Sequence, residues 1–168
     1  MKKYSALVLF AFLTAAFAGC GTPLPSDFPN LVPVKITVTD SGTPIDNVAV
    51  GLTQSDSGTS YATGGNTDAA GLLEVTTSMA THQAKGCPVG KFKVTLNKKP
   101  KYPSEKPQEE INQMTPEQTD AYGKIISKEA KEAKPIIPVK LNSMTTTPIE
   151  IDVPDGGKDF DFDISQYK

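Results

Sequence analysis

The sequence predicts an all-β fold, an antiparallel β-sandwich of about seven strands with one helical insert. Three observations carry this prediction. Apolar and polar residues alternate in several short runs, which is the period of a half-buried strand. Residues that favour turns, mainly Gly, Pro, Asn and Asp, separate these runs. One longer stretch, residues 115–134, has helical spacing instead and begins with a helix-start signal.

The first strands are expected between residues 34 and 64. Residues 34–39 (VKITVT) and 48–53 (VAVGLT) alternate apolar with polar or small side chains, and residues 40–44 (DSGTP) form the turn between them. A second turn at residues 55–58 leads into a weak third strand at residues 60–64.

The next two strands follow further polar turns. Residues 66–71 (NTDAAG) predict a tight turn in which Gly71 takes dihedral angles that other residues rarely adopt. Residues 72–77 (LLEVTT) predict a fourth strand. After a turn at residues 86–90 (GCPVG), residues 91–97 (KFKVTLN) predict a fifth strand with Phe92, Val94 and Leu96 on one face.

The composition changes from residue 98, where a loop rich in Lys and Pro runs to Pro107. Thr115 is expected to cap a helix, with Pro116 at its first position and Gln118 completing a capping box. Pro135 ends this helix, which we expect to lie on the sheet or to pack poorly on its flank. Its apolar face would contain Tyr122, Ile125, Ile126, Ala130 and Ala133.

Strand character returns after the helix. Residues 136–141 and 149–153 are predicted as strands, and the Asp-Gly sequence within residues 154–157 indicates a hairpin turn. The last strand is expected to close the core with Phe160, Phe162 and Ile164.

Composition limits the classes of function. The chain has 168 residues and a net charge of −2, which argues against nucleic acid as a partner. Every basic residue is Lys, and without Arg a bidentate carboxylate or phosphate site is not expected. The absence of Trp weakens the case for an aromatic sugar-binding platform.

The N-terminus has the pattern of an export signal. Two lysines precede an apolar run, residues 4–18, which has the length of a signal-peptide core and is shorter than a membrane-spanning helix. Residues 17–20 (FAGC) then resemble the lipobox of bacterial lipoproteins, with Phe17 in place of the usual aliphatic residue. This resemblance implies that residues 1–19 are a cleaved lipoprotein signal peptide and that Cys20 carries the lipid.

The lipobox resemblance also implies a location and a domain order. A lipid at Cys20 would be a membrane anchor in the cell envelope. Gly21, rather than Asp, favours the outer membrane in cells that have one. Residues 20–32 would be the lipidated Cys and a Pro-rich tether. Residues 33–165 would be the β-sandwich domain, with the helical insert at about residues 108–134.

Three short motifs carry a second resemblance. Residues 42–50 (GTPIDNVAV) resemble the Gly-x-Pro-x-x-Gly/Asn-Ala-x-Val start of carboxypeptidase regulatory-like domains, although Val48 replaces the usual Ala. Residues 67–71 (TDAAG) resemble the Thr-Asp-x-x-Gly turn of that family. Residues 88–94 (PVGKFKV) resemble its Pro-x-Gly-Lys-Tyr-x-Val segment.

This resemblance implies a transthyretin-like (prealbumin-like) sandwich. Modules of this family accompany peptidases, build surface adhesins and occur in envelope lipoproteins, so the fold alone does not determine the function. We expect a structural or protein-interaction role, and the alternative is a lipoprotein that binds a glycan or a small molecule. A glycan site would gather several of the tyrosines Tyr61, Tyr102, Tyr122 and Tyr167 in one groove.

The candidate chemical sites each favour a structural interpretation. His82 is the only histidine and falls in a polar stretch, so we expect a solvated loop residue. Asp159, Asp161 and Asp163 share one strand face, but about 6.6 Å between alternate side chains is too far for one calcium ion without further ligands from a loop. Cys87 has no partner if Cys20 is lipidated, and we expect a buried, apolar role. No catalytic, cofactor or metal site is predicted, and we expect no enzymatic activity.

Overall fold

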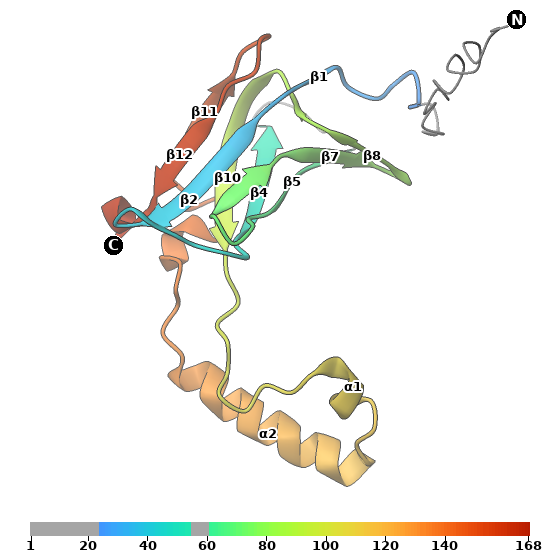
Figure 1. Ribbon diagram of the computed structural model, residues 1–168, viewed down its shortest axis with the longest axis vertical. Coiled ribbons are helices and arrows are strands. Elements are labelled where there is room, and N and C mark those ends of the chain that lie inside the picture. Colours follow the sequence, from blue (N-terminus) through green and yellow to red (C-terminus); the bar gives the residue numbers. More distant parts are fainter. Residues whose placement is uncertain (1–23, 55–60) are drawn as a thin grey trace, which may run out of the picture.

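The computed structural model describes residues 24–54 and 61–168. Two β-sheets stack against each other, and a separate pair of helices lies below them (Figure 1). The larger sheet contains, in spatial order, β11 (Glu150–Val153), β10 (Gly90–Asn97), β4 (Ala49–Gln54), β5 (Ala62–Asn66), β7 (Thr76–Met79) and β8 (His82–Lys85). The smaller sheet contains β12 (Phe160–Asp163), β2 (Lys35–Asp40), β3 (Thr43–Pro44) and β6 (Leu72–Glu74). A short pair joins β1 (Leu31–Val32) to β9 (Cys87–Pro88).

The alternation of the sequence places one side of each central strand in the core. Ile36 and Val38 of β2 are fully buried, as are Val94 and Leu96 of β10, and all four belong to one hydrophobic cluster. Burying a side chain of this size contributes about 1.5–3 kcal/mol. The predicted fold class, an all-β sandwich with one helical insert, is confirmed.

Two predicted turns have the expected backbone geometry. Ser41 and Gly42 both have positive φ, 51° and 80°, as a two-residue turn between paired antiparallel strands requires. Gly71 has a φ of 72°, and a Cβ there would lie 2.6 Å from the carbonyl oxygen of Val38. The Asp68 carboxylate closes this second turn by accepting hydrogen bonds from two backbone N–H groups.

The strand predicted at residues 72–77 is two strands that lie in different sheets. β6 pairs with β2, whereas β7 pairs with β5 and β8. Val75 lies at the crossing point, is 1% exposed, and donates its N–H to the carbonyl oxygen of Val34. The hairpin of β7 and β8 was not predicted, because its short polar run resembles a loop. The predicted turn at residues 86–90 likewise contains β9.

The strand predicted at residues 136–141 is wrong. This segment is irregular and ends in a 3-10 helix, η1 (Val139–Leu141). Pro138 precedes η1 and has no N–H to donate to a sheet. Ile137 and Leu141 are nevertheless 1% and 0% exposed, so the apolar residues of this segment fill the core without joining a strand.

The hairpin predicted at residues 154–157 is also wrong, although a turn is present. The N–H of Gly157 donates to the carbonyl oxygen of Pro154 at 2.9 Å, but the strands on either side do not pair with each other. β11 pairs with β10 in one sheet, and β12 pairs in parallel with β2 in the other. The turn therefore connects β11 of one sheet to β12 of the other. After β12 the chain forms a 3-10 helix, η2 (Ile164–Tyr167).

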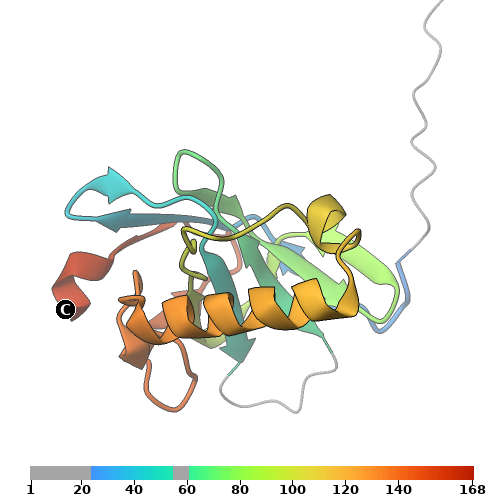
Figure 2. The same cartoon turned by 90° about the horizontal axis from the view of Figure 1, so that it is seen from below.

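The predicted helix is present as α2 (Pro116–Glu132), but it does not lie on the sheet. A short helix, α1 (Gln108–Ile111), precedes it. α2 is described along its whole length, and none of its residues is buried. Seen from below, α2 crosses in front of the sandwich as a separate element (Figure 2). Its apolar residues are too few to cover a sheet face.

The buried Thr67 hydroxyl forms hydrogen bonds with two backbone groups, and replacing it tests how much these bonds stabilise the fold. Its hydroxyl donates to the carbonyl oxygen of Ile45 at 2.8 Å and accepts from the N–H of Val48 at 2.9 Å, although the residue is only 5% exposed. Thr67→Val keeps the shape but leaves both backbone groups without this partner. We expect a loss of about 1–3 kcal/mol in the free energy of unfolding. Denaturant titration measures it, and Thr53→Val on β4 is the control, with about 0.5 kcal/mol or less expected.

Candidate functional site

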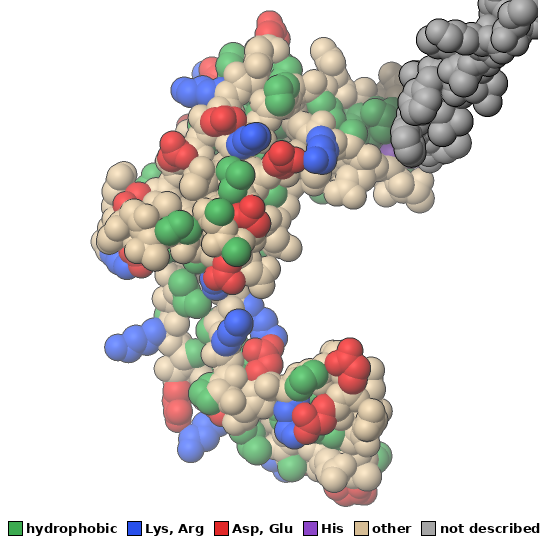
Figure 3. All heavy atoms as spheres, viewed as in Figure 1, with side chains coloured by type: hydrophobic (Ala, Val, Ile, Leu, Met, Phe, Trp, Pro, Cys, Tyr) green, Lys and Arg blue, Asp and Glu red, His purple; other side chains and the backbone are tan. Residues whose placement is uncertain are grey.

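Residues 98–136 form a helical arm that stands apart from the sandwich. The chain leaves the sandwich at the end of β10, passes through α1 and α2, and returns just before the buried residue Ile137. In Figure 3 the arm is a separate lobe joined to the sandwich by a narrow neck. β1 lies at the opposite end of the sandwich from the arm (Figure 1).

The sequence forms the arm from two extended segments and a capped helix. Prolines stiffen the extended segments, because each fixes its own φ and restricts the preceding residue. They are Pro100, Pro103, Pro107 and Pro135. The predicted capping box is present at the start of α2. The Thr115 hydroxyl accepts from the Gln118 N–H at 3.3 Å, and the Gln118 side chain accepts from the Thr115 N–H at 2.9 Å.

Hydrogen bonds join the outgoing segment of the arm to α2. The hydroxyl and the N–H of Ser104 both donate to the Glu129 carboxylate, at 2.6 and 3.2 Å. The N–H of Lys106 donates to the Tyr122 hydroxyl at 3.1 Å, and the Lys106 side chain pairs with Glu110. Because these bonds connect residues far apart in the arm, the arm is one folded unit.

One ion pair fastens the arm to the sandwich. The Lys98 ammonium donates to the carboxylate of Asp46 at 2.7 Å and to its backbone carbonyl at 2.5 Å. The Lys98 side chain is only 13% exposed. The hydrogen bond from Lys98 and its positive charge lower the pKa of the Asp46 carboxyl below its ordinary value of 3.8.

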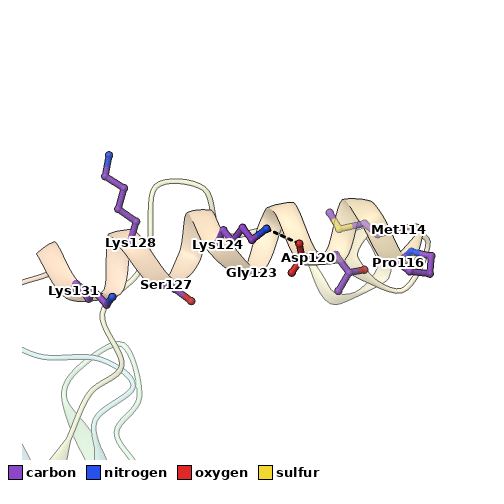
Figure 4. Close-up of a pocket in the computed structure, with 9 residues that line it drawn as sticks. Met114, Pro116, Asp120, Gly123, Lys124, Ser127, Lys128 and Lys131 are labelled. Carbon is purple, nitrogen blue, oxygen red and sulfur yellow. Dashed lines mark ion pairs between the residues drawn. The ribbon is translucent and has the colours of Figure 1, made fainter.

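Several hollows border the arm, and two of them are the larger ones. One, of about 580 Å³, lies at its root between Asp46, Tyr102, Lys134 and Ile136. The other, of about 980 Å³, is an open depression along the outer side of α2. Figure 4 shows this outer side, with the ion pair of Asp120 and Lys124 and with Lys131 farther along it.

The predicted tyrosine groove does not form among the described residues. Tyr102, Tyr122 and Tyr167 line three different hollows. Tyr61 instead donates its hydroxyl to the Gln54 side chain at 2.6 Å. The structure therefore does not bring these tyrosines together in one groove.

Two of the three aspartates on the acidic strand face, Asp159 and Asp163, accept hydrogen bonds from backbone N–H groups. Asp159 accepts from the N–H of Lys35 at 3.2 Å, and Asp163 accepts from the N–H groups of Ser41 and Ser165, both at 2.9 Å. The bonds from Ser165 and Ser41 lower the pKa of the Asp163 carboxyl. In the part of the chain that the structure describes, no three His, Cys, Asp or Glu side chains gather as metal ligands.

His82 and Cys87 occupy different surroundings. His82 was expected in a loop but lies on β8, half-exposed, with its Nδ1 3.5 Å from the Thr81 hydroxyl. Cys87 is fully buried beside Val32 in the short pair of β9 and β1, and burial raises the pKa of its thiol to about 12. A buried, protonated thiol is inert, which agrees with the predicted apolar role.

Residues 1–23 and 55–60 fall outside the described structure, and with them the predicted signal peptide, the predicted lipid attachment at Cys20 and the turn predicted at residues 55–58. Within residues 24–54 and 61–168, no helix has the length and apolar character needed to cross a membrane.

The sequence analysis did not predict that the helical arm projects from the sandwich. The available signal was the sparse apolar face of the helix together with the prolines on both sides of it.

No protein-family model, curated protein or solved structure matches this chain. The fold and the arm therefore define its class by architecture alone. It is an all-β sandwich that carries one projecting helical arm.

The ion pair at the root of the arm provides a second test. A lowered pKa in the folded state means that ionised Asp46 stabilises the fold above pH 3.8, and that this contribution is lost as the pH falls through the folded-state value. Lys98→Met removes the cause, so we expect the pKa of Asp46 to rise toward 3.8. Carboxyl carbon NMR titration measures it. Lys91→Met, an exposed lysine on β10, is the control; an equal shift there would contradict the assigned cause.

Proposed function

We propose that this protein is a lipid-anchored β-sandwich module of the bacterial cell envelope with a structural or protein-interaction role. The observation that carries the interaction role is the arm. α2 has 17 residues and buries none of them, and Ile125 is 49% exposed. Most helical stability in proteins comes from packing an apolar face against a partner, and the described part of the chain provides little for α2.

The anchor is supported by the sequence at residues 17–20. The apolar run before Cys20 is of signal-peptide length, and the Ala-Gly-Cys sequence falls where that run ends. The chain enters the sandwich through β1, at the end opposite the arm (Figure 1). With a lipid at Cys20 and a Pro-rich tether, the arm would point away from the membrane, and Gly21 favours the outer membrane.

We also propose that the sandwich is of the carboxypeptidase regulatory-like type. Two of the three motifs on which the resemblance depends coincide with well-defined turns, at Ser41-Gly42 and at residues 67–71. The third leads into β10, where Phe92 and Val94 are buried.

Lipid attachment is tested by metabolic labelling with a palmitate analogue in cells that express the full chain. We expect Cys20→Ala to abolish the label and to release the protein from the membrane fraction, because the thiol is the point of attachment. Cys87→Ala is the matched control and should keep both the label and the membrane location. Labelling that persists in Cys20→Ala would contradict the anchor.

The interaction role is tested by crosslinking in intact cells. A photoreactive residue replaces Ser127 on the outer side of α2 or, as a control, Lys91 on β10, since both positions are exposed. We expect a discrete, reproducible adduct from position 127 and little from position 91, identified by mass spectrometry. The same set of abundant neighbours at both positions would contradict a dedicated role for the arm.

A further inference from the structure

Asp155 is the only aspartate or asparagine of the chain that is followed directly by a glycine, Gly156. The pair lies in the turn of residues 154–157, which connects β11 of one sheet to β12 of the other. Both residues are exposed, and the Pro154 carbonyl oxygen closes the turn by accepting from the Gly157 N–H at 2.9 Å. The turn therefore presents an Asp-Gly sequence to solvent at a connection between the two sheets.

The two groups of this pair that can react with each other are free of other partners. The Asp155 carboxylate forms no hydrogen bond or ion pair with another described residue, and the backbone N–H of Gly156 donates to none of them. The space beside Gly156 is open, because a Cβ added there would have nothing within 4 Å. Glycine itself has no Cβ to hinder an approach to its nitrogen. The Asp155 carboxyl carbon and the Gly156 nitrogen can therefore meet.

We propose that Asp155 is a site of spontaneous covalent modification, at which its bond to Gly156 becomes an isoaspartyl bond, and that the product loosens the turn. The Gly156 nitrogen attacks the side-chain carbon of the protonated carboxyl group. A C–N bond forms, the hydroxyl leaves with the nitrogen's proton as water, and a five-membered succinimide ring remains. Water then adds to the main-chain carbonyl carbon of the ring, the bond from that carbon to nitrogen breaks, and the nitrogen regains a proton. One water is lost and one is gained, so no other reactant is needed.

The product has one more methylene group in its main chain, and the turn has little room for it. Before the turn, Val153 is fully buried in β11. After the turn, Gly157 packs closely on Pro33, because a Cβ on Gly157 would lie 2.1 Å from the Pro33 carbonyl oxygen. The carboxylate of Asp159 then accepts from the N–H of Lys35 at 3.2 Å. The longer main chain therefore disturbs the contacts of residues 157–159 with residues 33–35, and it destabilises the fold.

The test ages the full chain for several weeks in mildly acidic buffer, well below its unfolding temperature. Trypsin then releases residues 141–158, since this peptide follows Lys140 and ends at Lys158. The isoaspartyl peptide has the mass of the original but separates from it in chromatography, and electron-transfer fragmentation locates the altered bond. We expect isoaspartate at Asp155 and none at Asp152, which lies in β11 of the same peptide.

Two variants test the route. The φ of Gly156 is not positive and its surroundings are open, so Gly156→Ala fits the turn. We expect it to slow the modification on the order of tenfold, because the added Cβ hinders the attack. Asp155→Glu keeps the charge but would have to close a six-membered ring, and we expect it to abolish the product. Equal rates in Gly156→Ala and the original chain would overturn the route.

Ageing in denaturant provides the comparison that decides whether the folded turn reacts. If isoaspartate forms at Asp155 only in the unfolded chain, the proposal is overturned, because the turn then holds the Gly156 nitrogen away from the carboxyl. The isoaspartyl form of the whole chain is finally separated and titrated with denaturant. We expect its unfolding midpoint to lie below that of the unaged chain, and an unchanged midpoint would overturn the loosening of the turn.

Discussion

The apolar sides of β2 and β10 enter one hydrophobic cluster between the two sheets, and the remaining elements are arranged around it. Ile36 and Val38 come from one sheet, and Val94 and Leu96 from the other, and all four are fully buried. The two strands carry this alternation in the sequence itself. Other elements add side chains to this cluster, as η2 does with Ile164. The helix α2 contributes none.

Because the cluster is complete without the arm, the arm is free to serve another purpose. Its connections to the sandwich are two extended segments and the ion pair of Lys98 with Asp46. Its internal bonds, from Ser104 and Lys106 to α2, hold its shape without a core. A structural unit that is ordered, projecting and unburied has its surface available to partners.

The predictions that succeeded depended on local chemistry. The capping box at Thr115 placed the start of α2 correctly, because both of its hydrogen bonds are made within four residues. The positive φ of Gly71 followed from turn composition. The wrong predictions concerned partners distant in sequence. Residues 136–141 have the apolar content of a strand but fill the core without pairing, and the Asp-Gly turn connects two sheets instead of two neighbouring strands.

The sequence by itself determined which residues alternate between apolar and polar, where several of the turns fall, and where the long helix begins and ends. Only the tertiary structure decided that residues 72–77 divide between two sheets at Val75, that β12 runs parallel to β2, and that α2 stands away from the sheet. The physical reason is the range of the interactions. Periodicity, turns and caps depend on neighbours a few residues away, whereas strand partners depend on which backbone groups and apolar faces remain unsatisfied after the rest of the chain has packed.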